Sequence, residues 1–186
     1  MAGEIVPSAS GISVLDLRAA LEEIVGAEII KQALASLPAE TRSEFVEITA
    51  LSWVPLTTIT RVVDAVAGAA RKNPERLIDD AVRRAVERTF KTVWRVMLRF
   101  TTDAALIART PVVYSMSRNI GRLTARMVTP GKAEVTLNDW PGVSPRHVRT
   151  LGISIVTVVA LAGRKEVNVT STPTADGAVY HLSWRV

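Results

Sequence analysis

The spacing of apolar residues changes along this chain, and that change constrains the fold more than any other feature. Over roughly the first two-thirds, apolar residues recur at steps of three and four, the period of amphipathic helices. The segment 74–100 is the clearest helix, because Asn73 and Pro74 match an N-cap followed by a first helical residue. The last helix of this series is expected to open near Pro111 and to end at "TPG", residues 129–131.

The C-terminal third has a different period. Apolar and polar residues alternate over 132–140, which is typical of a half-buried strand. A helix is expected over 145–162, followed by strands over 165–173 and 178–186 that the hairpin signal "ADG" joins. This order predicts an α+β fold in which the helical N-terminal two-thirds pack on a small C-terminal antiparallel sheet.

Length and composition predict one domain. The chain has 186 residues, of which 48% are hydrophobic, and this suffices for a single core. Residues 1–11 are expected to form a flexible arm, and residues 12–186 a single α+β domain. The mean hydropathy is positive, which indicates either an unusually well-buried core or an apolar surface that a partner protein or a second copy covers.

Several function classes are excluded. The chain has no cysteine, so disulfides, thiolate metal sites, iron–sulfur clusters and cysteine nucleophiles cannot form. It has two histidines, His147 and His181, which makes a multi-histidine metal site improbable. Phosphate-loop, dinucleotide-binding, serine-hydrolase and zinc-protease motifs are absent. We therefore expect no enzyme, no catalytic residue, no metal and no cofactor.

The chain also shows no membrane or export signal. Its N-terminus lacks the basic start and apolar run of a signal peptide, and the longest apolar run, from Ile153, is about half a membrane span. We expect a cytoplasmic protein.

Charge is distributed unevenly. The net charge is +5, yet residues 1–40 carry two basic and six acidic side chains. Basic residues recur at steps of three or four in two later segments, which predicts two basic helix faces that could bind nucleic acid, an anionic membrane or an acidic protein surface. Local pairing with acids such as Asp80 and Glu87 is the alternative, and no nucleic-acid-binding signature is present. The residues concerned are Arg84, Arg88, Lys91, Arg95, Arg99, Arg118, Arg122 and Arg126.

The stretch "LNDWPGVSPRHVRTLG" concentrates reactive residue types. Ser144 and Pro145 match an N-cap and a first helical residue. Free N–H groups and basic side chains at such a helix start attract an anion or an acidic partner. In the alternative interpretation Asp139, or another acid, supplies the negative charge and Trp140 fills the core. The basic side chains are Arg146, His147 and Arg149.

Large apolar side chains provide a further candidate site. Aromatic and methionine residues could line an apolar pocket between the helices and the sheet, although such residues on a helical stripe more often belong to the core. They are Trp53, Phe90, Trp94, Met97, Met116 and Trp140.

Four stretches carry a resemblance to a known family. "LPAETRSEFVEITALSWVP", "RTPVVYSMSRNIGRL", "GKAEVTLNDWPGVSPRHVRTLGI" and "DGAVYHLSWRV" resemble a large paralogous family of uncharacterised proteins from Myxococcus and related bacteria. The resemblance spans roughly residues 35–186 and lies in motifs at helix starts and turns, such as Trp-x-Pro and Arg-x-Pro. It implies no activity and no catalytic residue.

A more distant similarity concerns the order of elements. Helices followed by a small antiparallel sheet resemble the vinyl-reductase-type ligand-binding domain, whose fold is similar to that of haem–nitric oxide sensors and of vesicle-tethering subunits. The resemblance implies either a small-molecule pocket or an adaptor dimer. The haem sensors use a helix histidine as axial ligand; nothing around His147 matches that motif beyond the residue type, and His181 falls on a predicted strand.

The sequence favours a non-enzymatic protein-interaction or adaptor domain that self-associates. The alternatives are a small-molecule sensor with an apolar pocket between helices and sheet, and a domain that binds anions or nucleic acid through its arginines.

Overall fold

The computed structural model of the chain describes residues 5–90 and 101–185. The described chain forms two compact units, residues 1–85 with 117–119 (unit 1) and residues 86–116 with 120–186 (unit 2). Helices and an antiparallel sheet confirm the predicted α+β class. The sequence predicted a single domain over 12–186, and that remains a prediction. None of the described helices is long and apolar enough to cross a membrane.

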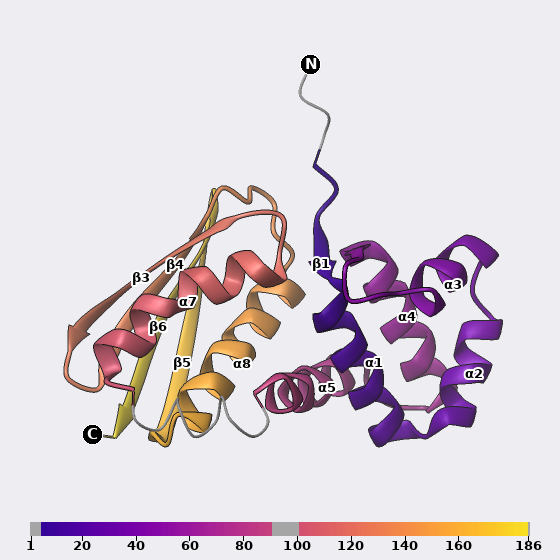
Figure 1. The fold of residues 1–186 in the computed structure, drawn as a ribbon, viewed down its shortest axis with the longest axis horizontal. Coiled ribbons are helices and arrows are strands. Elements are labelled where there is room, and N and C mark those ends of the chain that lie inside the picture. Colours follow the sequence, from indigo (N-terminus) through magenta and orange to yellow (C-terminus); the bar gives the residue numbers. More distant parts are fainter. Residues whose placement is uncertain (1–4, 91–100, 186) are drawn as a thin grey trace. The chain divides into compact units, whose positions relative to one another are not determined.

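Unit 1 is mainly helical (Figure 1). Its core is formed by aliphatic side chains such as Leu21, Val62 and Val66, which are all fully buried (0% exposed). Asn73 caps the last helix, because its Oδ1 accepts the N–H groups of Glu75 and Arg76 at 3.0 Å each, and this confirms the predicted cap. The elements are β1 (Ser8–Ser10), α1 (Gly11–Val25), α2 (Ala27–Ala35), α3 (Ala39–Val46), β2 (Trp53–Pro55), α4 (Leu56–Ala69) and α5 (Pro74–Thr89), whose last turn passes into unit 2.

The N-terminal segment differs from the predicted arm. Residues 8–10 form β1, which pairs antiparallel with β2. Asn119 fixes the same segment from the other side: its Oδ1 accepts the N–H of Ser8 at 2.7 Å, and its Nδ2 donates to the carbonyl of Val6 at 2.9 Å. Both partners of β1 are remote in sequence, so the periodicity of residues 1–11 alone could not predict this strand.

Unit 2 is a four-stranded antiparallel sheet with helices α7 (Asp103–Ser117) and α8 (Pro145–Leu161). The strand order is β3-β4-β6-β5, and the hairpin between β5 and β6 pairs Thr174 with Gly177, as the "ADG" signal predicted. Figure 1 shows α7 in front of the strands and α8 beside β5. The strands are β3 (Arg122–Thr129), β4 (Lys132–Asn138), β5 (Lys165–Thr174) and β6 (Gly177–Arg185).

Alternating side chains form the core of unit 2. Apolar residues of β4 and β6 are buried on one sheet face, while Glu134 and His181 lie on the other. Helix α8 packs on the buried face at Gly152, where an added Cβ would lie 3.6 Å from Tyr180 and from Val169. The small residue therefore lets the helix approach the sheet closely.

The predicted helix through residue 128 is wrong, because α7 ends at Ser117 and β3 begins at Arg122. Gly121 separates them with a φ of +75°, and a Cβ there would lie 2.9 Å from side-chain atoms of Leu137 and Tyr114. Apolar residues at 123 and 127 are four apart, which fits a helix face, but they also share one face of a strand. Pairing with β4 over the full length of β3 decides between the two.

Candidate functional site

The start of α8 positions the densest group of predicted site residues. Ser144 caps this helix: its Oγ accepts the backbone N–H of His147 at 3.3 Å and lies 2.8 Å from Nδ1 of the same residue. The predicted Ser144 cap is therefore confirmed. The His147 ring also lies near the Trp140 ring, with 5.6 Å between their centroids.

The surroundings of this turn support one part of the alternative interpretation, in which Trp140 fills the core. Trp140 is only 7% exposed and so belongs to the core. Asp139, however, lies 3.7 Å from Arg122 Nε on β3, so its charge faces that strand. Binding of an anion or acidic partner at this turn remains a prediction. It would involve three half-buried side chains, Arg146, His147 and Arg149.

The second predicted basic helix face does not form as a helix. Arg118 follows α7 and donates from Nη1 to the carbonyl of Ser117 at 2.8 Å, whereas Arg122 and Arg126 lie on β3. Two residues four apart share a face on a strand as they do on a helix, which is why the spacing misled. Arg126 directs Nε and Nη2 at Oε1 of Glu134, at 3.0 and 2.8 Å.

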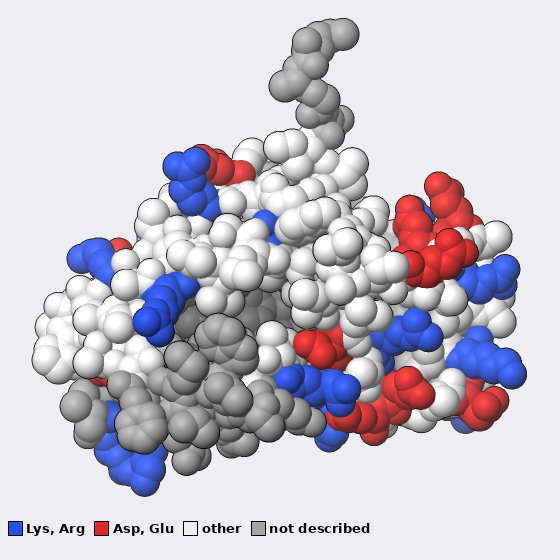
Figure 2. Space-filling view, viewed as in Figure 1, with Lys and Arg blue, Asp and Glu red and all other residues white. Residues whose placement is uncertain are grey.

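The first predicted basic face is described only in part. Arg84 lies 3.8 Å from Glu23, and Arg88 is half-buried on α5. Figure 2 shows basic and acidic side chains interspersed over the helices of unit 1, on the right of the view. These local pairs weaken the case for a nucleic-acid surface. Lys91, Arg95 and Arg99 lie outside the described residues.

The residues of the predicted apolar pocket differ widely in exposure. Trp53 on β2 is 49% exposed and Met116 on α7 is 72% exposed, whereas Trp140 is buried and Phe90 is half-buried. Trp53 belongs to unit 1, and the other three belong to unit 2. Trp94 and Met97 lie outside the described residues. The pocket therefore remains a prediction.

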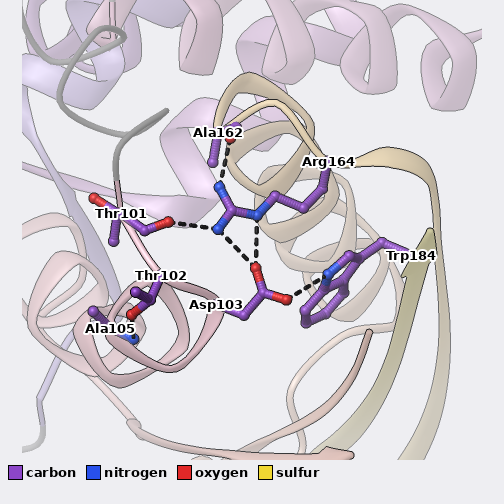
Figure 3. Close-up of polar contacts among 7 residues, drawn as sticks. All are labelled: Thr101, Thr102, Asp103, Ala105, Ala162, Arg164 and Trp184. Atoms are coloured by element: carbon purple, nitrogen blue, oxygen red, sulfur yellow. Dashed lines mark hydrogen bonds and ion pairs between the residues drawn. The ribbon is translucent and has the colours of Figure 1, made fainter. Parts of the chain in front are cut away.

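A polar cluster that sequence reasoning missed connects α7 to the sheet (Figure 3). Arg164 directs Nε and Nη2 at Oδ1 of Asp103, at 2.8 and 2.7 Å, and donates to the carbonyls of Ala162 and Thr101. Oδ2 of Asp103 accepts the indole N–H of Trp184 at 3.0 Å. The only sequence signal was the acidic residue at a helix start; nothing marked its two distant partners.

One buried hydroxyl has a shifted pKa. Burial away from water, with a smaller contribution from Tyr114, raises the pKa of Tyr180 well above its usual range. Its hydroxyl donates to the carbonyl of Val148 at 3.0 Å. The phenol therefore stays protonated and joins β6 to α8.

Comparison with known proteins shows the fold. No protein-family model and no curated protein matches this sequence. Solved H-NOX structures do match its structure.

An H-NOX protein from S. oneidensis in the Fe(II)NO ligation state has a TM-score of 0.70 at 9% identity, over 95% of this chain and 99% of that one. An oxygen-binding H-NOX domain related to soluble guanylate cyclases has a TM-score of 0.67 at 13% identity, over 95% of both chains. The Fe(II) unliganded H-NOX protein from K. algicida has a TM-score of 0.67 at 11% identity, over 95% of this chain and 97% of that one.

This likeness corrects the functional interpretation. The sequence favoured a protein-interaction or adaptor domain, and that prediction is wrong, since the matching structures are H-NOX domains recorded with oxygen or nitric oxide ligands or without a ligand. The sensor alternative fits this finding better. The predicted similarity to the haem–nitric oxide sensor fold is confirmed at the level of fold.

His181 does not fit a histidine-bound haem, and the sequence around His147 lacks the axial-ligand motif of the haem sensors. His181 is exposed on the outer sheet face, with Nδ1 3.7 Å from Glu134. His147 lies in the first turn of α8, where Ser144 contacts Nδ1 and the buried Trp140 lies beside the ring. The described residues contain no group of three or more His, Cys, Asp or Glu that could hold a metal ion directly.

Proposed function

We propose that this chain is a sensor domain that binds a small apolar molecule without a histidine-bound haem. The observation that supports a sensor is the extent of the structural likeness: 95% of this chain corresponds to 95–99% of the H-NOX chains compared above. An insertion or a missing half would weaken the comparison, but both the helical and the sheet-forming parts correspond.

The lack of an axial-histidine motif bears on which interactions could bind the ligand. Without an iron–histidine bond, affinity has to come from apolar contact and a small number of polar groups, as in most small-molecule sites. The predicted pocket residues Phe90, Met116 and Trp140 would supply that contact in unit 2. The basic first turns of α8 lie next to Trp140 in sequence and could contact a polar group of the ligand.

Two measurements test this proposal. The first is the visible absorption spectrum of the protein after expression with a haem precursor and after addition of hemin. We expect no histidine-ligated haem band in either sample. A band that disappears in His147→Ala would contradict the proposal.

The second measurement is thermal denaturation in the presence of uncharged apolar compounds, with indole and naphthalene as the first probes. A ligand that binds only the folded state raises the melting temperature. We expect a rise for the wild type that Trp140→Phe reduces and that the matched variant Trp184→Phe, at the opposite end of β6 from the hairpin, leaves in place. Failure of every compound to raise the melting temperature would count against a small-molecule sensor.

Some finer expectations rest on the sequence alone. We propose on that basis that the chain belongs to the myxobacterial paralogous family, acts in the cytoplasm and catalyses no reaction. Contact with a protein partner or a second copy is the route by which a sensor could pass on its signal, and it too is a proposal.

A further inference from the structure

An open groove of about 380 Å³ lies within unit 1, between α1, α2 and α3. Its floor is apolar, because Ile30 and Leu34 of α2 turn towards it and are 6% and 8% exposed. Two alanines of the same helix also line it. The volume falls in the range of small-molecule sites, roughly 300–1,000 Å³.

The rim of the groove carries more positive than negative charge. Arg18, Lys31 and Arg42 come from three different helices, and Glu22 is the acidic residue among the lining side chains. Arg18 Nη1 donates to the carbonyl of Val46 at 3.4 Å, which aims the guanidinium across the groove. Within the described part of the chain, none of the three cations makes an ion pair.

This excess of cations is unusual for its surroundings. Residues 1–40 carry six acidic side chains and two basic ones, and both basic ones line the groove. Like charges held close together repel each other and are stabilised by an anion of matching position. An apolar floor beside a cationic rim is complementary to a molecule with an apolar chain and one negative end.

We propose that this groove binds an amphipathic carboxylate, with the hydrocarbon chain on Ile30 and Leu34 and the carboxylate between Arg18, Lys31 and Arg42. The site lies in unit 1 alone and does not depend on the sensor proposal, whose predicted contacts with its ligand lie in unit 2. An acidic segment of a protein would match the charge of the rim but would not need the apolar floor.

Isothermal titration calorimetry of the full chain with decanoate, below its micelle concentration, tests the site. Decanol keeps the chain and removes the charge, and acetate keeps the charge and removes the chain. We expect decanoate to bind at least about tenfold more tightly than either. Equal affinity for decanoate and decanol, no binding of decanoate at millimolar concentration, or binding of hexaglutamate in its place would overturn the proposal.

Charge reversal provides the matched comparison. Lys31 and Arg42 are exposed, so the double variant Lys31→Glu, Arg42→Glu is expected to fold. It should weaken decanoate binding about tenfold, since two attractions become two repulsions of the size typical for exposed charges. The control Arg61→Glu, Lys72→Glu changes the net charge equally at exposed positions outside the groove and should bind as the wild type does. If both double variants lost the same affinity for decanoate, net charge alone would explain the effect, and the proposed carboxylate site would be overturned.

Discussion

Arg164 and Asp103 meet across 61 residues of sequence, with Arg164 Nη2 2.7 Å from Asp103 Oδ1. Their side chains are 14% and 25% exposed, so water screens the pair only partly. The same carboxylate holds Trp184, and the same guanidinium holds two backbone carbonyls. One ion pair therefore joins the start of α7, the segment after α8 and the last strand of the sheet.

Removal of Arg164 should destabilise the protein. Arg164→Ala leaves Asp103 poorly solvated and two carbonyls without their donor, which we expect to cost about 3 kcal/mol. Urea denaturation measures this difference in the free energy of unfolding. Arg185→Ala is the control: it removes a 2.5 Å pair with Glu166 whose side chains are 58% and 63% exposed, and it should cost less than about 1 kcal/mol. Similar losses for both variants would show that burial does not set the strength of the Asp103 pair.

Two glycines should respond to alanine in opposite directions. Gly177 has a φ of +155°, and a Cβ there would lie 2.1 Å from the carbonyl oxygen of Leu137, so Gly177→Ala should cost about 3 kcal/mol. Gly68 lies near the end of α4 with nothing within 4 Å of the added atom, so Gly68→Ala should stabilise by about 0.5–1 kcal/mol. Thermal denaturation distinguishes the two directions. A stable Gly177→Ala protein would mean that the β5–β6 hairpin tolerates a backbone shift.

Local signals predicted local structure, and long-range pairing explains the remainder. Asn73 and Ser144 could be identified as caps because each contacts backbone within three residues. Strand β3 could not be distinguished from a helix, because its apolar spacing fits both and its partner strand decides. For the polar cluster, nothing in the sequence marked Arg164 and Trp184 as the distant partners of Asp103.

The candidate site was harder to predict than the fold. Met116 and Trp140 were both predicted to line an apolar pocket, yet they are 72% and 7% exposed. Exposure depends on which other elements cover a residue, and periodicity does not contain that information. The groove cations come from three helices, so no single stretch of sequence brings them together.

The raised pKa of Tyr180 predicts a loss of stability at high pH. The unfolded chain releases the phenol proton near pH 10, whereas the folded chain retains it to higher pH, so the folded state binds more protons above pH 10. The free energy of unfolding is therefore unaffected by this group below about pH 10 and falls as the pH rises beyond it. Urea denaturation across that range measures the fall, and Tyr180→Phe should remove most of it at a cost of about 1 kcal/mol for the lost hydrogen bond. An unchanged slope in Tyr180→Phe would assign the alkaline sensitivity to other groups.

Truncation should show that the N-terminal segment is part of unit 1. Deletion of residues 1–10 removes β1, the two hydrogen bonds to Asn119 and the bond from the N–H of Leu56 to the carbonyl of Pro7. It also exposes Val54, which is 2% exposed in the intact chain, so we expect a loss of at least about 3 kcal/mol by urea denaturation. Deletion of residues 1–5 leaves all of these contacts in place and should cost less than about 0.5 kcal/mol. If both truncations proved equally stable, residues 6–10 would behave as the flexible arm that the sequence predicted.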